Sequence, residues 1–208
     1  MTELKDMLIS TYDQIVGEYV RHEFDSSSME KHYQRFSQGL PENGQILDVG
    51  CGPGQATKRF CRMGYKVTGI DLSRKMLEFA ESAAPEAIFY QMDVENITLT
   101  EKFDGIWAAF ILVHVPRRQH GIILRRFFEL LTPNGLLCLG MLEGQGEKVV
   151  PEPYNRNLRQ FFVFVSRQEI ENSLIDAGFD VQYHSSQDFD AEGEVFRLSS
   201  TFAKKKPA

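Results

Sequence analysis

The chain has 208 residues, of which 42% are hydrophobic and 25% are charged. This length and balance are typical of one soluble globular domain and exclude a wholly disordered chain. Asp and Glu total 29 against 23 for Lys and Arg, which gives a formal net charge of -6. That charge argues against a general nucleic-acid or anionic-membrane surface, because both need a basic face.

The three cysteines, Cys51, Cys61 and Cys138, show no CxxC spacing. We therefore expect reduced thiols, with neither a disulfide framework nor a metal site. The longest apolar run, 106–113, is far shorter than the roughly 20 residues that a membrane helix needs. The first ten residues include acidic side chains where a signal peptide carries basic ones. The sequence predicts a cytoplasmic protein with no membrane partner.

Hydrophobic spacing predicts a helix over 4–22 with one apolar face, followed by a shorter helix over 29–38. Beyond residue 44, short apolar runs alternate with helical stretches. The predicted strands cover 45–49, 66–70, 87–91, 103–109 and 136–141, and the helices between them cover 55–62, 73–83 and 117–131. This alternation is typical of right-handed βαβ units and a mostly parallel sheet with helices on both faces.

The last third of the chain departs from this alternation. A capping box at Ser166–Glu169 predicts a helix that ends near Gly178. The runs 179–185 and 195–202 flank a short polar turn with no room for a helix, so they predict an antiparallel hairpin. The sheet is thus expected to hold five parallel strands and this hairpin. We expect residues 143–147 to be a mobile loop.

A glycine-rich turn, Gly50-Cys51-Gly52-Pro53-Gly54, joins the first predicted strand of the sheet to a helix. Backbone amides at such a helix N-terminus can bind the polar groups of a ligand. The spacing is GxGxG, which differs from the GxGxxG of dinucleotide-binding folds. Taken alone, the turn also fits a simple tight connection between a strand and a helix.

Acidic residues strengthen the ligand interpretation. Asp71 ends the second predicted strand, where a carboxylate can accept hydrogen bonds from both ribose hydroxyls of a nucleoside. Asp93 ends the third, where it can accept from the amino group of adenine, with Val94 offering apolar contact. One such carboxylate is commonly a helix cap or turn residue. Together with Asp48, three acids at successive strand ends predict a nucleoside site.

Five segments, in this order, closely resemble the class I S-adenosylmethionine-dependent methyltransferases: ILDVGCGPGQATKRF, VTGIDLSRKML, YQMDVEN, FDGIWAAFILVHVPR and LTPNGLLCLG. The resemblance covers about Tyr12 to Phe202 and is strongest to small bacterial members of the family. It implies an α/β fold, a Rossmann-like three-layer sandwich whose seven-stranded, mostly parallel sheet ends in an antiparallel hairpin. It also implies S-adenosyl-L-methionine as the cofactor.

The resemblance assigns cofactor contacts residue by residue. They are Asp48, Gly50, Cys51, Gly52 and Gly54 at the methionine end, Asp71 at the ribose, Leu72, Met76, Asp93 and Val94 at the adenine, and Phe110 and Ile111 near the sulfonium.

Residues 1–208 are interpreted as one methyltransferase domain, with an N-terminal helical lid (1–40), a Rossmann-like core (41–202) and a tail (203–208). On the lid, Tyr12 and Tyr19 resemble aromatic residues that face the cofactor in small-molecule methyltransferases. A tyrosine ring near a sulfonium gains about 0.5–2 kcal/mol from cation–π attraction. Ordinary packing of an amphipathic helix on the core explains the same spacing.

His114 lies beside the predicted crevice and is the candidate general base if the acceptor must lose a proton early. The alternative is a structural histidine bonded to backbone at the strand end. The region after the fourth predicted strand reads Ala108-Ala109-Phe110-Ile111 and lacks the Asn/Asp-Pro-Pro-aromatic motif of enzymes that methylate base amino groups. This absence and the acidic net charge disfavour nucleic acid as a partner.

The sequence therefore predicts a monomer or homodimer that transfers a methyl group to a small polar molecule. Two alternatives stay open. One is a methyltransferase that acts on protein or RNA, and the other is a catalytically silent module that binds S-adenosylmethionine.

Overall fold

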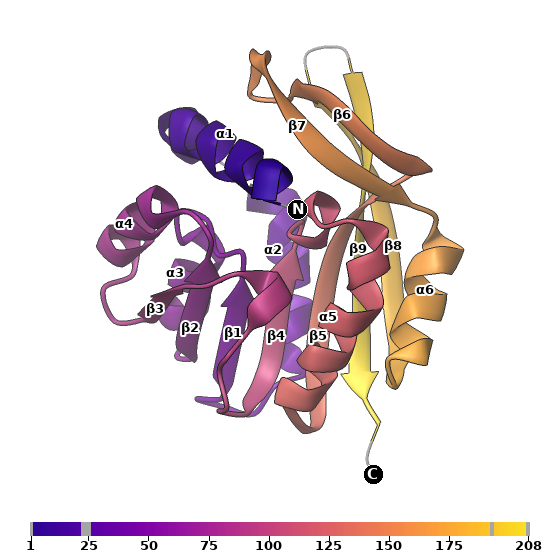
Figure 1. Cartoon of the computed structure of the whole chain (residues 1–208). Coiled ribbons are helices and arrows are strands. Elements are labelled where there is room, and N and C mark those ends of the chain that lie inside the picture. Colours follow the sequence, from indigo (N-terminus) through magenta and orange to yellow (C-terminus); the bar gives the residue numbers. More distant parts are fainter. Residues whose placement is uncertain (1, 22–25, 192–193, 207–208) are drawn as a thin grey trace.

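A computed structural model describes residues 2–21, 26–191 and 194–206. A central sheet is covered by helices on both faces (Figure 1). The helices are α1 (Thr2–Arg21), α2 (Ser26–Gln38), α3 (Gln55–Arg62), α4 (Arg74–Ala83), α5 (Arg117–Leu130) and α6 (Arg167–Asp176), with short 3-10 helices η1 (Val94–Asn96) and η2 (Leu112–His114). The strands are β1 (Gln45–Val49), β2 (Lys66–Asp71), β3 (Ile88–Gln91), β4 (Phe103–Ala109), β5 (Leu131–Glu143), β6 (Gly146–Glu152), β7 (Asn155–Val165), β8 (Phe179–Ala191) and β9 (Glu194–Lys205).

The strands follow the order β3-β2-β1-β4-β5, and neighbours in this series are parallel. β9 pairs antiparallel with β5, and β8 pairs antiparallel with β9, so the chain ends in the predicted hairpin. On one face of the sheet, Trp107 packs against Phe36 of α2 and Phe60 of α3. On the other face, α5 and α6 contribute Phe127 and Leu174 to the larger core cluster. The Rossmann-like α/β prediction is confirmed.

A second hairpin, β6–β7, was not predicted. Residues 143–147 do not form a loop throughout, because Glu143 ends β5 and Gly146 and Glu147 already belong to β6. β7 joins β5 in parallel through two register pairs, Leu142 with Phe164 and Glu143 with Val165. The described sheet therefore has nine strands, the seven expected and this added pair. β6 contains Pro151, which has no backbone N–H to donate. An edge strand such as β6 tolerates proline because one side of the strand has no neighbouring strand to bond.

The predicted tail at 203–208 is wrong for its first residues, since β9 continues to Lys205. The ammonium group of Lys205 donates hydrogen bonds to the carbonyl oxygens of Phe128 (2.7 Å) and Leu131 (2.8 Å) at the end of α5. A lysine there satisfies carbonyls that lack partners within the helix and complements the helix dipole. Lys205 thus stabilises the junction between α5 and β5.

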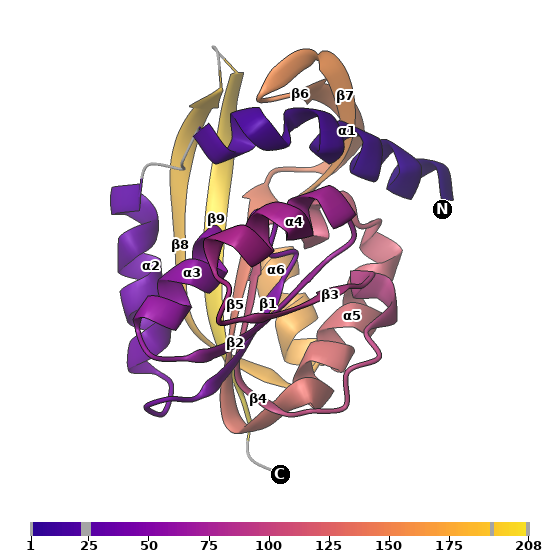
Figure 2. The same ribbon diagram turned by 90° about the vertical axis from the view of Figure 1, so that its left-hand side faces the viewer.

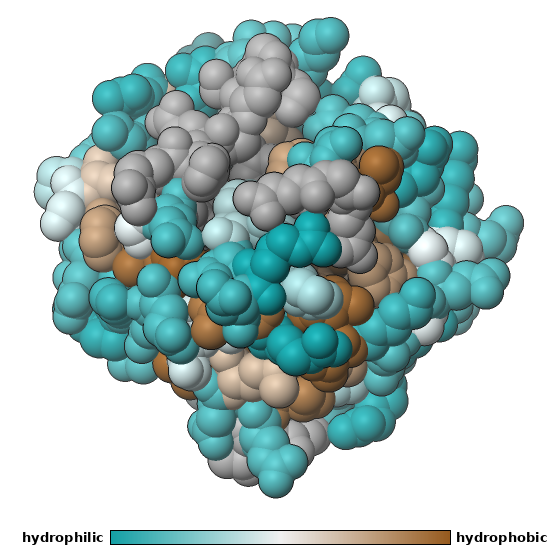
Figure 3. All heavy atoms as spheres, turned by 90° about the horizontal axis from the view of Figure 1, so that it is seen from above, coloured by the Kyte–Doolittle hydropathy of each residue, from teal (hydrophilic) through white to brown (hydrophobic). Residues whose placement is uncertain are grey.

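Helix α1 runs across the sheet between α4 and β7 (Figures 1 and 2). Its apolar face is packed, with Ile15 and Val16 buried. Figure 3 looks down on this end of the molecule, where mostly hydrophilic side chains surround smaller hydrophobic areas. Within the described ranges, none of the helices is both long and apolar enough to cross a membrane.

Candidate functional site

The glycine turn after β1 adopts backbone conformations that favour glycine. Gly50, Gly52 and Gly54 have φ angles of 68°, 51° and 84°. A Cβ at Gly50 would lie 2.8 Å from a side-chain carbon of Ile111, and one at Gly54 would lie 2.8 Å from the Cα of Ala80. Gly52 has no neighbour within 4 Å of such a Cβ. The turn is thus tightly packed on two sides and open at Gly52, where a ligand can approach the backbone.

Asp71, at the end of β2, holds this turn in place. One carboxylate oxygen accepts from the N–H of Gly52 at 2.9 Å, and the other accepts from the N–H of Ser73 at 2.9 Å. Burial raises the pKa of Asp71, and the backbone N–H donors partly oppose that rise. A carboxylate offers about four acceptor positions, so these backbone donors leave acceptor capacity for hydroxyl groups of a ligand. This geometry fits the predicted contact with ribose.

Asp48 is 2% exposed in β1, and its carboxylate accepts a hydrogen bond of 2.6 Å from the hydroxyl of Thr57. Burial raises the pKa of Asp48 to about 7, although the Thr57 hydroxyl opposes the shift. Asp48 borders a cavity of about 80 Å³ at the predicted methionine end, together with Cys51, Gly52 and Phe110. Because Thr57 lies in the first turn of α3, its hydrogen bond also fixes the Asp48 carboxylate against the start of that helix.

Asp93 caps η1 by accepting from the N–H of Glu95 at 2.9 Å. Its other carboxylate oxygen pairs with the ammonium of Lys5 in α1 at 2.6 Å, and Lys5 also lies 3.0 Å from the carboxylate of Glu95. Asp93 and the buried Val94 border a narrow cavity of about 30 Å³. The predicted adenine position is therefore tied to α1 by an ion pair that the sequence analysis did not identify.

His114 connects α1 to β7. Its Nδ1 lies 3.1 Å from the carbonyl oxygen of Phe161, and its Nε2 lies 2.8 Å from the hydroxyl of Tyr12. Since a carbonyl only accepts, Nδ1 carries the hydrogen and Nε2 accepts from the tyrosine. Burial lowers the pKa of His114 to about 4, so the ring is neutral at physiological pH. Both ring nitrogens have hydrogen-bond partners, which agrees with a structural role for His114 as the alternative to a general base.

A third cavity, of about 80 Å³, lies between the adenine and methionine cavities and is partly roofed by Leu8 and Tyr12 of α1. Twelve of the predicted cofactor residues line one or more of these three cavities. They are Tyr12, Asp48, Gly50, Cys51, Gly52, Asp71, Leu72, Met76, Asp93, Val94, Phe110 and Ile111. Gly54 borders none of the three and packs against α4. The side chain of Tyr19 lies outside the described residues.

Phe110 lies where several cavities meet. It is a non-glycine residue with φ at 61°, and its N–H donates to the carbonyl oxygen of Gly140 at 3.0 Å. Beyond it and His114 lies an aromatic cavity of about 60 Å³, whose walls include Tyr12, Glu152, Tyr154, Phe162, Phe189 and Phe196. Glu152 and Tyr154 come from the β6–β7 hairpin, so the sequence analysis missed them together with that hairpin.

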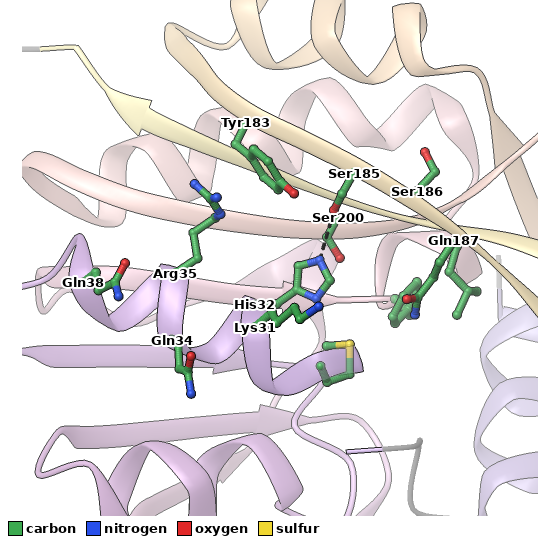
Figure 4. A pocket seen from close by; sticks show the side chains of 13 residues that line it. Lys31, His32, Gln34, Arg35, Gln38, Tyr183, Ser185, Ser186, Gln187 and Ser200 are labelled. Atoms are coloured by element: carbon green, nitrogen blue, oxygen red, sulfur yellow. Dashed lines mark hydrogen bonds between the residues drawn. The ribbon is translucent and has the colours of Figure 1, made fainter. Parts of the chain in front are cut away.

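A larger polar cleft of about 480 Å³ lies between α2 and the β8–β9 hairpin and also reaches Phe110. Figure 4 shows Lys31 and Arg35 of α2 opposite Tyr183 and Ser200. His32 lies 3.0 Å from the hydroxyl of Ser185, and the Arg35 guanidinium lies 3.8 Å from the centre of the Tyr183 ring. Among the residues that the structure describes, the lining of this cleft holds Lys31, His32 and Arg35 and no carboxylate, in contrast to the acidic molecule as a whole.

The low pKa of His114 has a measurable consequence for stability. Between pH 6.5 and 4, the unfolded chain gains a proton at this residue while the folded chain does not. Stability is therefore lost as the pH falls, by up to about 3 kcal/mol. We expect wild type to lose stability relative to His114→Gln over that range in denaturant titrations. Parallel pH profiles of the two proteins would contradict the neutral, buried state of the ring.

Comparison with known proteins gives this geometry a context. A family model described as a methyltransferase domain matches residues 46–135. The Ubiquinone biosynthesis O-methyltransferase of Psychrobacter arcticus is 30% identical over 65% of this chain and 58% of its own length. The Trans-aconitate 2-methyltransferase of Enterobacter sp. is 34% identical over 52% of this chain and 43% of its own length. The chain thus spans about half the length of these curated relatives.

Among solved structures, the 1,6-didemethyltoxoflavin-N1-methyltransferase of Burkholderia thailandensis, with bound 1,6-didemethyltoxoflavin and S-adenosylhomocysteine, matches with a TM-score of 0.76 at 22% identity. The match covers 99% of this chain and 90% of that chain, and it shows a common fold. The sequence relatives and the family model are methyltransferases and the fold agrees with them, so the chain is similar to the class I S-adenosylmethionine-dependent methyltransferases.

Proposed function

We propose that the protein transfers a methyl group from S-adenosylmethionine to a small polar molecule. The observation that carries this proposal is the set of three adjoining cavities at the ends of β1, β2 and β3. Their lining combines an open glycine turn with Asp71 and Asp93, two carboxylates that would face a ribose and an adenine. S-adenosylmethionine joins an adenosine to a methionine, so two carboxylates for the adenosine beside an open backbone turn for the methionine would suit this cofactor.

The chain's own residues would bind and align the reactants. S-adenosylmethionine, when bound, supplies an electrophilic methyl group on a sulfonium. Asp71 would accept hydrogen bonds from the ribose, Asp93 would face the adenine, and Asp48 and the turn at Gly52 would border the methionine end. Tyr12 and Phe110 would exclude water at the point where the cofactor cavities meet the aromatic cavity. Alignment and exclusion of water together lower the barrier by several kcal/mol in reactions of this type.

His114 has two proposed roles, general base and positioning residue. The hydrogen bonds to Phe161 and Tyr12 support the second, because they fix the tyrosine hydroxyl of α1 at the junction of the cavities. A pKa of about 4 also makes the ring a weak base at neutral pH.

Calorimetry with S-adenosylhomocysteine tests cofactor recognition directly. We expect a dissociation constant in the micromolar range and at least about 100-fold weaker binding of NAD, because the GxGxG turn differs from the dinucleotide-binding pattern. Equal or tighter binding of NAD would overturn the proposal.

The acceptor class is tested by incubating the protein and labelled S-adenosylmethionine with separated small-molecule, RNA and protein fractions. Label confined to RNA or protein supports that alternative, and binding without transfer to any fraction supports a silent module.

A further inference from the structure

We propose that Glu152 of the β6–β7 hairpin hydrogen-bonds the methyl acceptor and receives its proton, and that the acceptor is a flat aromatic molecule with an acidic O–H or N–H. This inference rests on the proposed methyl transfer. Glu152 lines the aromatic cavity, and Tyr12, Phe110 and His114 line both that cavity and a cofactor cavity. A molecule lying in the aromatic cavity would therefore reach both Glu152 and the cofactor region.

The carboxylate of Glu152 lacks the partners that a buried acid normally has. Glu152 is only 2% exposed, yet among the described residues its Oε2 has no hydrogen-bond partner, and its Oε1 accepts a long contact of 3.4 Å from the N–H of Tyr154. Leaving a buried charged or polar group unsatisfied costs about 1–3 kcal/mol or more. A group kept at that cost while facing a cavity is well explained by a ligand that supplies the missing donor.

The walls of the cavity indicate what kind of molecule carries that donor. Phe162 and Phe196 lie with ring centres 6.4 Å apart, and Phe189 and Tyr154 add further aromatic surface. Aromatic walls favour a flat ring through offset or edge-to-face contacts. A single carboxylate among them selects for one O–H or N–H group. The polar cleft between α2 and β8 offers the opposite chemistry, since its described lining has basic side chains and no carboxylate.

The proposed step balances as follows. The acceptor's oxygen or nitrogen forms a bond to the methyl carbon, and the carbon–sulfur bond breaks with its electron pair retained by sulfur, which becomes a thioether. The acceptor's proton passes to Oε2 of Glu152. Burial raises the pKa of Glu152 to about 7, so the carboxylate is a stronger base than an ordinary glutamate. Solvent takes the proton after the products leave.

The first test needs no acceptor. Glu152→Gln keeps the shape of the side chain and removes the charge. At pH 8 the wild-type carboxyl is ionised and unpartnered, so we expect the variant to melt about 5 °C higher than wild type. At pH 5 the wild-type carboxyl is protonated, and the two melting temperatures should agree closely. Glu86→Gln, at an exposed turn position, is the matched control and should change neither value. A variant that melts lower at pH 8 would show a structural role and overturn the proposal.

The second test measures acceptor binding to protein saturated with S-adenosylhomocysteine. The probes are 4-nitrophenol, other simple phenols, and ring N–H heteroaromatics, followed by absorbance and calorimetry. We expect wild type to bind at least one probe, Glu152→Gln to bind it at least about tenfold more weakly, and Arg35→Ala in the polar cleft to bind it like wild type. Failure of every probe to bind would overturn the acceptor class, and weakened binding by Arg35→Ala alone would place the acceptor in the polar cleft.

Both tests separate this inference from the proposed function. Glu152 borders none of the three cofactor cavities, so the affinity of Glu152→Gln for S-adenosylhomocysteine should equal that of wild type. Loss of S-adenosylhomocysteine binding in wild type would instead count against the methyltransferase proposal itself. Once an acceptor is identified, the rate of the wild type should increase as the pH rises through 7, because Glu152 becomes ionised there. Glu152→Gln should lower kcat and remove this increase, while His114→Gln should keep it.

Discussion

Replacing Asp71 with alanine is expected to weaken the binding of S-adenosylhomocysteine by at least about 100-fold. Two hydrogen bonds from ribose hydroxyls to a carboxylate are worth about 1.5–3 kcal/mol each, and their loss alone gives this factor. The same substitution also leaves the N–H groups of Gly52 and Ser73 without the acceptor that now holds the glycine turn. The turn should therefore become less ordered as well, which adds to the loss.

Calorimetry of three variants would establish the role of this carboxylate. Asp71→Asn keeps one acceptor oxygen and should lose less affinity than Asp71→Ala. Glu86→Ala removes an exposed carboxylate and should bind like wild type. The melting temperature should fall only modestly in Asp71→Ala, because removing a buried acid with a raised pKa offsets part of the lost backbone contacts. Affinity within threefold of wild type would rule out the ribose contact.

Helix α1 is expected to exchange its amide hydrogens rapidly in the free protein and at least about tenfold more slowly with S-adenosylhomocysteine bound. Three polar contacts tie it to the edge of the cofactor cavities. These three are Lys5 to Asp93, Tyr12 to His114, and the Ser73 hydroxyl, which donates to Asp13 at 2.5 Å, and Lys5 and Asp13 have further partners in Glu95 and Lys75. Leu8 and Tyr12 of α1 line the cavities beneath it, so a helix that acts as the proposed lid would move to admit the ligand.

Hydrogen exchange followed by mass spectrometry gives the comparison within one molecule. Strand β1 serves as the internal reference, and its protection should change little when ligand is added. Tyr12→Phe removes one tether and should speed exchange in α1 of the free protein without affecting β1. If α1 is already as protected as β1 before ligand is added, the helix is part of the core and the proposed lid should be abandoned.

The order of elements in the core followed directly from the sequence. Alternating apolar runs and capped helices placed α3 and β4 with the bounds that the structure has and α6 to within two residues at its end, because each of these elements carries its own local signals. The terminal hairpin could be predicted from the short distance between two apolar runs. β6 could not, because its sequence, GEKVVPE, carries charges and a proline and lacks a clear alternation. Its strand conformation depends on β7, whose buried phenylalanines anchor the pair.

The candidate site was predictable where motif and topology coincide. Asp48, Asp71 and Asp93 follow or end successive parallel strands, so their proximity follows from the fold itself. Lys5 and Glu152 could not be found in this way, since their roles depend on the docking of α1 and of the β6–β7 hairpin. The tautomer and low pKa of His114 likewise depend on Phe161 and Tyr12, which lie 47 and 102 residues away.

The β6–β7 hairpin meets the rest of the sheet through only two register pairs, Leu142 with Phe164 and Glu143 with Val165. The cofactor cavities, in contrast, are built from the ends of β1, β2, β3 and β4 and from α1. The described lining of these three cavities includes no residue of the hairpin, which supplies Glu152, Tyr154 and Phe162 to the aromatic cavity. Under the proposed function, exchanging the hairpin between homologues should therefore change the preferred acceptor more than the affinity for S-adenosylhomocysteine.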